Sequence, residues 1–186
     1  MVSVPNLITL GRLLLVPVII SLLLDGRHAL VFTLFLVAGA SDAVDGFVAK
    51  RYNSATALGA YLDPLADKAL LVSVFVALGI LGHLPVWLVI LVVSRDILII
   101  GAIVLSFLIG HPVKIAPLLI SKANTFLQIT LASYVLAFLT FPNLDIPFMN
   151  VGNLTWAVAA TTILSGGSYL FTWYRSVAAW EVGHEE

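Results

Sequence analysis

Four aspartates stand close together in a chain that is otherwise poor in charge. The protein has 186 residues, of which 61% are hydrophobic and 10% are charged, and its acidic residues number ten. Four of these ten fall in one short segment, at Asp42, Asp45, Asp63 and Asp67. Carboxylate oxygens are the ligands that hard cations such as Mg²⁺ and Mn²⁺ prefer. The segment therefore indicates a site for divalent metal, and such ions commonly serve phosphate chemistry.

The spacing of the aspartates puts each pair on one side of a helix. Asp42 and Asp45 are three residues apart, and Asp63 and Asp67 are four apart; side chains at these intervals share a helix face. In an antiparallel hairpin all four would lie at one depth, roughly 6–12 Å from the connecting loop at a rise of about 1.5 Å per residue. Each unpaired charge costs on the order of 2.5–3.5 kcal/mol near a bilayer centre. Two divalent cations would compensate this charge.

Two other roles compete with metal binding as an explanation of the four carboxylates. Structural polar contacts between helices do not call for four carboxylates at matched spacing, and an ion or proton pathway would spread them along the membrane normal. Neither role explains Gly46 and Gly59, which leave room for a bulky ligand beside the two pairs. An enzyme is therefore the main prediction, and a small ion transporter is the alternative from another class.

The elements that must position these residues are hydrophobic helices. The mean hydropathy is +1.09, and a membrane span takes about 17–25 mainly apolar residues. Six segments qualify: 7–24, 29–50, 58–81, 84–109, 115–140 and 151–174. Because lipid cannot satisfy open backbone groups, each segment must be a helix. We predict an all-α integral membrane protein, a bundle of six transmembrane helices forming a single domain over residues 1–186.

Charge and cysteine content narrow the partners and the compartment. The net charge of −1 argues against nucleic acid as a partner, and the absence of cysteine excludes disulfides and thiolate metal sites. Basic residues flank one set of span ends, at Lys50, Arg51, Lys114 and Arg175. The positive-inside rule then predicts that these ends, and both termini, face the cytoplasm.

The segment around the aspartates also carries a family resemblance. It reads Asp42-x-x-Asp45-Gly46-x-x-Ala49-Lys50 and, eight residues later, Gly59-x-x-x-Asp63-x-x-x-Asp67. This motif resembles the signature of the CDP-alcohol phosphotransferases, a family of six-helix membrane enzymes whose active site opens to the cytoplasm. One position departs, because the family usually has Arg where Lys50 stands. Lysine keeps the charge but loses the planar two-pronged donor.

The resemblance implies a reaction and a set of roles. An acceptor alcohol would replace CMP on a CDP-linked lipid, CDP-diacylglycerol. The four aspartates would bind two divalent cations, Mg²⁺ or Mn²⁺, and Asp67 would also be the general base that takes the proton of the acceptor hydroxyl. The positions that match the family's CDP site are Gly46, Lys50, Thr56 and Gly59. The opening PNLITLGR resembles bacterial members, which implies the bacterial inner membrane, and family members are often homodimers.

Two cations inside the apolar segments, Arg95 and Lys122, bear on the acceptor. An ion pair with the neighbouring Asp96 would account for Arg95 by itself, but a second cation favours a phosphate-binding pair for an anionic acceptor. Phosphatidylglycerol would give cardiolipin, and glycerol 3-phosphate would give phosphatidylglycerophosphate. The segments SRD at 94–96 and ISKANT at 120–125 look more like cardiolipin synthases, so phosphatidylglycerol is the favoured acceptor.

Overall fold

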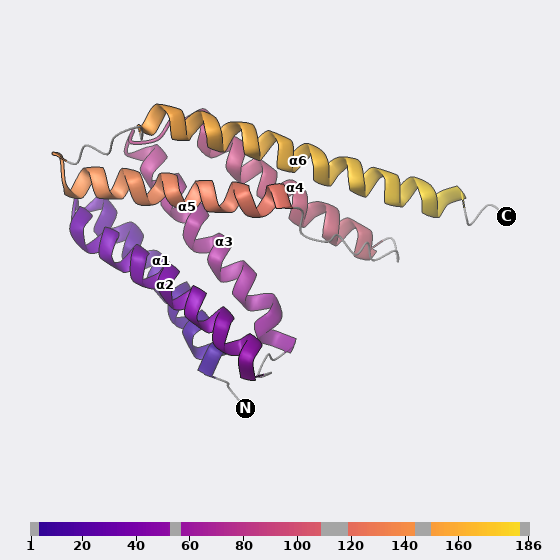
Figure 1. Ribbon diagram of the computed structural model, residues 1–186, viewed down its shortest axis with the longest axis horizontal. Coiled ribbons are helices and arrows are strands. Elements are labelled where there is room, and N and C mark those ends of the chain that lie inside the picture. Colours follow the sequence, from indigo (N-terminus) through magenta and orange to yellow (C-terminus); the bar gives the residue numbers. More distant parts are fainter. Residues whose placement is uncertain (1–3, 53–56, 109–118, 144–149, 183–186) are drawn as a thin grey trace. The chain divides into compact units, whose positions relative to one another are not determined.

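The computed structural model describes residues 4–52, 57–108, 119–143 and 150–182, which form six helices and no strand over these ranges (Figure 1). The helices are α1 Val4–Leu24, α2 His28–Tyr52, α3 Ala57–Ile80, α4 Val86–Leu108, α5 Leu119–Thr140 and α6 Val151–Val182. The prediction of an all-α protein is confirmed, and each predicted segment corresponds to one helix. The largest difference is that α6 continues past 174, because its last turns contain neither proline nor glycine to end it.

The apolar helices identify an integral membrane protein. Three stretches in the described residues are long and apolar enough to cross a bilayer: Val86–Ser106, Leu119–Thr140 and Val151–Ser176. Shorter apolar stretches occur in the described parts of α1, α2 and α3. Many large apolar side chains are exposed on the helices, as expected where lipid rather than water is the solvent. The crossing of the membrane by all six helices stays a prediction.

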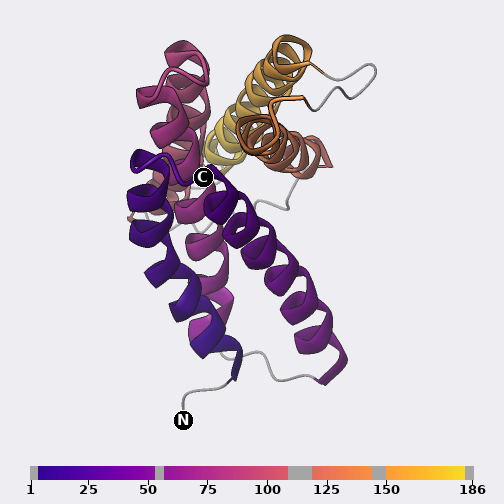
Figure 2. The same ribbon diagram turned by 90° about the vertical axis from the view of Figure 1, so that its left-hand side faces the viewer.

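The chain divides into two compact units, and the first comprises residues 1–85 with 132–148. Helix α1 packs against both α2 and α3. Figures 1 and 2 show α2 running in the direction opposite to α1 and α3, so the end of α2 and the starts of α1 and α3 lie at the same end of this unit. The core consists of buried side chains from all three helices, among them Ile19, Leu23, Val31, Phe35, Leu70, Val74, Phe75 and Leu78.

Two glycines end helices in this unit. Gly26 and Gly82 have positive φ angles of 71° and 76°, the left-handed conformation that a side chain disfavours. In both turns the next residue donates its N–H to a carbonyl five residues earlier, from Arg27 to Leu22 and from His83 to Leu78. This hydrogen bond is typical of the Schellman motif, which satisfies the last carbonyls of a helix. These two turns therefore end α1 and α3 at the glycines.

The second unit comprises residues 86–131 with 149–186. Helices α4 and α6 run parallel within it. At one end the rings of Trp87 and Trp156 lie 5.3 Å apart, and at the other the Trp173 indole N–H donates to Ser106 Oγ at 2.8 Å. The first part of α5 runs antiparallel to α6. Ser121 of α5 and Ser165 of α6 both accept hydrogen bonds from Arg95, and Asn124, three residues further along α5, accepts one from Thr162, three residues earlier on α6. The buried core includes Leu88, Val92, Leu131 and Val158.

We expect Gly82→Ala to destabilise the protein by about 1–2 kcal/mol, because an alanine pays the left-handed backbone cost that glycine avoids. Gly101→Ala is the matched control, since Gly101 lies inside α4 with no neighbouring atom within 4 Å of an added Cβ. The control should be neutral or stabilising by up to about 1 kcal/mol. Thermal unfolding of the detergent-solubilised variants measures both changes. Equal melting temperatures for the two variants would contradict the role of the turn.

Candidate active site

The helices that carry the four aspartates meet the first geometric requirement of the predicted metal site. Asp42 and Asp45 lie in the last part of α2, and Asp63 and Asp67 lie in the first half of α3. Helices α2 and α3 run in opposite directions, and the end of α2 and the start of α3 face the same way in both views (Figures 1 and 2). The backbone thus places both pairs toward one end of the first unit, as the antiparallel arrangement requires.

The side chains of these residues lie outside the part of the structure that is described. The same holds for Gly46, Lys50 and Gly59 on the two helices, and Thr56 is outside the described residues altogether. Among the described side chains, no group of three or more His, Asp or Glu residues is arranged to hold a metal ion, but the four aspartates do not belong to that set. The metal, base and CDP assignments therefore stay predictions.

A buried arginine organises the second unit. Arg95 on α4 is 5% exposed. Its Nη1 donates to Asp96 Oδ1 at 2.7 Å, and its Nη2 donates to Ser121 Oγ at 2.6 Å and to Ser165 Oγ at 2.5 Å. The guanidinium also lies 5.7 Å from the ring centroid of Tyr169. Three helices thus surround one cation with a carboxylate, two hydroxyl groups and an aromatic face, which together replace the water that the charge loses.

The simpler explanation of Arg95, an ion pair with its neighbour, is present in the structure. Arg95 and Asp96 form a salt bridge with both side chains buried, so their charges cancel within the apolar unit. The Nε of Arg95 has no hydrogen-bond partner among the described residues. Each terminal nitrogen of the guanidinium thus has at least one partner, whereas the buried Nε–H has none among the described residues.

Lys122 does not join this cluster. The residue before it, Ser121, turns to Arg95, and adjacent positions on a helix point in different directions. Lys122 is exposed within the second unit. The two cations that the sequence predicted as a phosphate-binding pair are therefore placed differently: one is buried and neutralised, and the other is open to the surroundings.

Sequence reasoning missed a polar contact that joins α5 to α6. Asn124 is fully buried, and its Oδ1 accepts hydrogen bonds from Thr161 and Thr162, each at 2.9 Å. One turn further along α5, Gln128 is also fully buried, and neither of its amide atoms has a partner among the described residues. The available signal was the run of small polar residues in α6, which includes Ser165 three residues after Thr162. Such hydrogen bonds hold helices together in lipid.

We expect Arg95→Gln to destabilise the protein by about 3–5 kcal/mol, because it leaves the Asp96 carboxylate buried without its cation. The double variant Arg95→Gln with Asp96→Asn should recover part of this loss, since it removes both charges. Thermal unfolding in detergent of Arg95→Gln, Asp96→Asn and the double variant gives the three values, with Arg175→Gln at an exposed arginine as the control. If the two single losses simply add in the double variant, the buried ion pair does not stabilise the unit.

Comparisons with known proteins place the chain in a family. A model of the CDP-alcohol phosphatidyltransferase family matches residues 2–173. Cardiolipin synthase (CMP-forming) of Rattus norvegicus is 32% identical over 183 residues, covering 90% of this chain and 60% of the rat protein. The CDP-diacylglycerol–glycerol-3-phosphate 3-phosphatidyltransferase of Bacillus subtilis is 31% identical over 185 residues, covering 91% of this chain and 94% of that protein.

The chloroplastic CDP-diacylglycerol–glycerol-3-phosphate 3-phosphatidyltransferase 1 of Oryza sativa is 35% identical over 185 residues. This match covers 90% of this chain and 56% of the rice protein. The chain thus spans less than two thirds of the rat and rice relatives and nearly all of the bacterial one. The family model covers both the aspartate motif and the arginine cluster. The chain belongs to the CDP-alcohol phosphatidyltransferase family, and its long apolar helices are those of an integral membrane protein.

Proposed function

We propose that the protein transfers the phosphatidyl group of CDP-diacylglycerol to phosphatidylglycerol, giving cardiolipin and CMP. The observation that carries this proposal is the motif of four aspartates on α2 and α3, in a chain of the CDP-alcohol phosphatidyltransferase family. The active site would face the cytoplasm in a bacterial inner membrane, where basic residues flank the ends of the spans. Assembly as a homodimer belongs to the same proposal.

The donor set fits two divalent cations. Asp42, Asp45, Asp63 and Asp67 offer hard carboxylate oxygens from two antiparallel helices, a ligand type suited to Mg²⁺ or Mn²⁺. When bound, the cations would supply positive charge beside the diphosphate of the donor lipid. Gly46 and Gly59 leave space for the nucleotide, and Lys50 and Thr56 would donate to it.

The bond changes need a base near the acceptor. The acceptor hydroxyl oxygen forms a bond to the phosphorus that bears diacylglycerol, the phosphoanhydride bond to CMP breaks, and the phosphate of CMP keeps the electron pair. The proton of the hydroxyl passes to the carboxylate of Asp67. Proton transfer by a positioned base typically contributes about 10²–10⁴-fold in rate. Loss of the Asp67 carboxylate should therefore lower turnover and leave substrate binding in place.

Family membership supports an enzyme over an ion transporter, the two classes of function that the carboxylates leave open. A small ion transporter was the alternative, and the chain instead matches a family of transferases over residues 2–173. An enzyme also accounts for the glycines beside each aspartate pair, which a transport path does not require.

The acceptor is an anionic glycerol derivative in this proposal, and two candidates remain. The segments SRD and ISKANT favour phosphatidylglycerol. The coverage of 94% of the Bacillus subtilis relative favours glycerol 3-phosphate as the second candidate. Lys122 is the stronger candidate for direct contact with the acceptor phosphate, because it is exposed, whereas the terminal nitrogens of Arg95 are already engaged. Arg95 would contribute by its hydrogen bond to Ser121, which positions the start of α5 and thereby Lys122.

The acceptor is tested by offering phosphatidylglycerol and glycerol 3-phosphate in separate reactions. Each contains purified protein, CDP-diacylglycerol and Mg²⁺ or Mn²⁺, and the lipid product is identified by mass. We expect cardiolipin from the first reaction. Phosphatidylglycerophosphate from the second reaction alone would replace the proposed acceptor by the second candidate. Product in neither reaction would contradict the transferase assignment.

Asp67→Asn should lower kcat by about 10²–10⁴-fold, because the amide cannot accept the hydroxyl proton. Binding of CDP-diacylglycerol should persist, since three aspartates remain to hold metal. Turnover is measured as CMP release and binding as the shift of the melting temperature on adding CDP and metal. Near wild-type turnover in this variant would show that Asp67 is not the base.

Lys122→Ala should raise KM for the acceptor by about 10- to 150-fold and leave KM for CDP-diacylglycerol nearly unchanged. The physical reason is the loss of one charge-assisted contact to the acceptor phosphate, a contact worth roughly 1.5–3 kcal/mol. Arg27→Ala, at an exposed arginine in the turn between α1 and α2, serves as the control for lost surface charge. Equal increases of KM for both substrates would remove Lys122 from the acceptor site.

A further inference from the structure

One buried cation, Arg12 on α1, has no role in the reaction proposed above. Its side chain is 4% exposed, and α1 contains no other charged residue. A guanidinium among apolar side chains needs an opposite charge or a set of hydrogen bonds. Arg12 is engaged with another residue of the structure, so its charge serves a group on one of the elements around α1.

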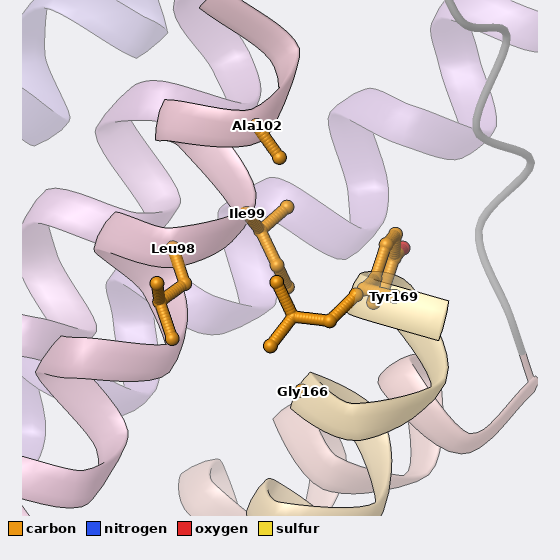
Figure 3. A pocket seen from close by; sticks show the side chains of 6 residues that line it. Leu98, Ile99, Ala102, Gly166 and Tyr169 are labelled. Atoms are coloured by element: carbon orange, nitrogen blue, oxygen red, sulfur yellow. The ribbon is translucent and has the colours of Figure 1, made fainter. Parts of the chain in front are cut away.

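The buried charges of the second unit, as far as its side chains are described, neutralise each other in the pair of Arg95 and Asp96. Figure 3 shows a shallow groove between α4 and α6 in this unit. The groove is lined by apolar groups and one tyrosine: Leu98, Ile99, Ala102, Gly166, Tyr169 and Leu170. This lining carries no ionic charge. The buried charge that still needs a purpose therefore lies in the first unit.

Arg12 lies on the side of α1 that forms the core of the first unit. The buried side chains in the described part of this helix are Arg12, Ile19 and Leu23, which are seven and four residues apart and therefore share one side. Leu10 and Leu14, by contrast, are exposed. The arginine thus faces α2 and α3, the two helices that pack on α1.

The aspartates continue the core sides of α2 and α3. On α3, Asp67 precedes the buried Leu70 and Val74 by three and seven residues. On α2, Asp42 follows the buried Ala38 by four. Positions at these intervals lie on one side of a helix. All acidic residues of the three helices belong to the motif of four aspartates, so α2 and α3 offer Arg12 no other carboxylate.

The depth of Arg12 matches that of Asp67. The rings of His28 and His83 lie 6.2 Å apart, and each histidine comes shortly after the end of α1 or α3, so these two ends are level. Counted back from them, Arg12 and Asp67 are about 18 and 20 Å away along the helix axes. Asp42 on α2 is about 21 Å from the same end.

The predicted CDP positions lie on the other side of the aspartates. Lys50 follows Asp45 and Gly59 precedes Asp63, both toward the segment that joins α2 to α3. Arg12 lies at the opposite, deeper end of the motif. A contact with a carboxylate therefore suits its position better than a contact with the nucleotide.

We propose that Arg12 is a positioning residue for Asp67: its guanidinium pairs with this carboxylate and holds it toward the space shared by α1, α2 and α3. Helix α1 packs more extensively against α3 than against α2, which favours Asp67 over Asp42 as the partner. The inference rests on the proposed function, because it gives the general base of that reaction an ion-pair partner. A carboxylate fixed in this way stays within reach of the acceptor hydroxyl.

The contact is tested by a double-mutant cycle on metal-free protein in detergent. Arg12→Gln leaves a carboxylate without its cation and should lower the melting temperature by roughly 6–20 °C. In the Asp67→Asn background the same substitution should cost less than half as much, because the ion pair is already lost. In the Asp42→Asn background, the matched control, the full loss should remain. Equal losses in all three backgrounds, or a reduced loss with Asp42→Asn alone, would overturn the inference.

Turnover separates positioning from a purely structural role. Arg12→Gln should lower kcat by roughly 10–100-fold and leave KM for CDP-diacylglycerol within about twofold of wild type. Arg12→Lys retains the charge and should recover part of kcat. An unchanged kcat, or a KM that rises as much as kcat falls, would overturn the inference. Wild type without any transferase activity would contradict the proposed function instead, and the stability cycle would still decide whether Arg12 pairs with Asp67.

Crosslinking tests the same contact if Arg12→Gln does not fold. The chain contains no cysteine, so Arg12→Cys with Asp67→Cys introduces two unique thiols, and it removes both charges together. In membranes, a short bifunctional thiol reagent should join α1 to α3 in this variant, as detected by mass spectrometry after proteolysis. It should not do so for Leu14→Cys with Asp67→Cys, since Leu14 is 65% exposed. No crosslink in the first variant, or equal crosslinking in both, would overturn the inference.

Discussion

A charge inside a hydrocarbon layer must be matched by a partner, and this constraint explains much of the described structure. In the second unit the partner of Arg95 is protein: Asp96 neutralises it, and Ser121, Ser165 and Tyr169 complete its surroundings. In the first unit four aspartates lie on two antiparallel helices, together with the buried Arg12 of α1 and with Lys68, which follows Asp67 on α3. We propose that bound divalent cations balance the charge of the four aspartates.

These two solutions suit different purposes. A neutralised arginine that contacts three helices fixes their relative positions, because its hydrogen bonds are directional and costly to break in an apolar interior. The contact of Asn124 with two threonines of α6 has the same effect one turn away. The four aspartates would instead bind metal and, through the metal, a diphosphate. In this proposal the Arg95 cluster is rigid because its charge is neutralised by protein, and the aspartates are reactive because their charge is neutralised by bound metal.

The sequence predicted the elements well because a membrane leaves few choices. The length of each apolar segment determines where a helix forms, and Gly26 and Gly82 adopt the backbone conformation that ends a helix. The helices and these turns therefore depend on local residues. The aspartate motif could be recognised for the same reason, because the two aspartates of each pair are only three or four residues apart on one helix. The partners of Arg95 were only partly predictable: Asp96 is adjacent, but Ser121 and Ser165 are 26 and 70 residues away. Such contacts depend on the register of α5 and α6, which no periodicity in the chain reports.

The central claim is that the aspartates of α2 and α3 form a joint site for metal and nucleotide diphosphate. The most direct measurement is the melting temperature of detergent-solubilised protein with CDP, with Mg²⁺ or Mn²⁺, and with both, for wild type and Asp45→Asn. The account predicts stabilisation of wild type by CDP together with metal that clearly exceeds the effect of either alone, and loss of this effect in Asp45→Asn. Equal stabilisation by CDP without metal, or an undiminished effect in Asp45→Asn, would contradict it.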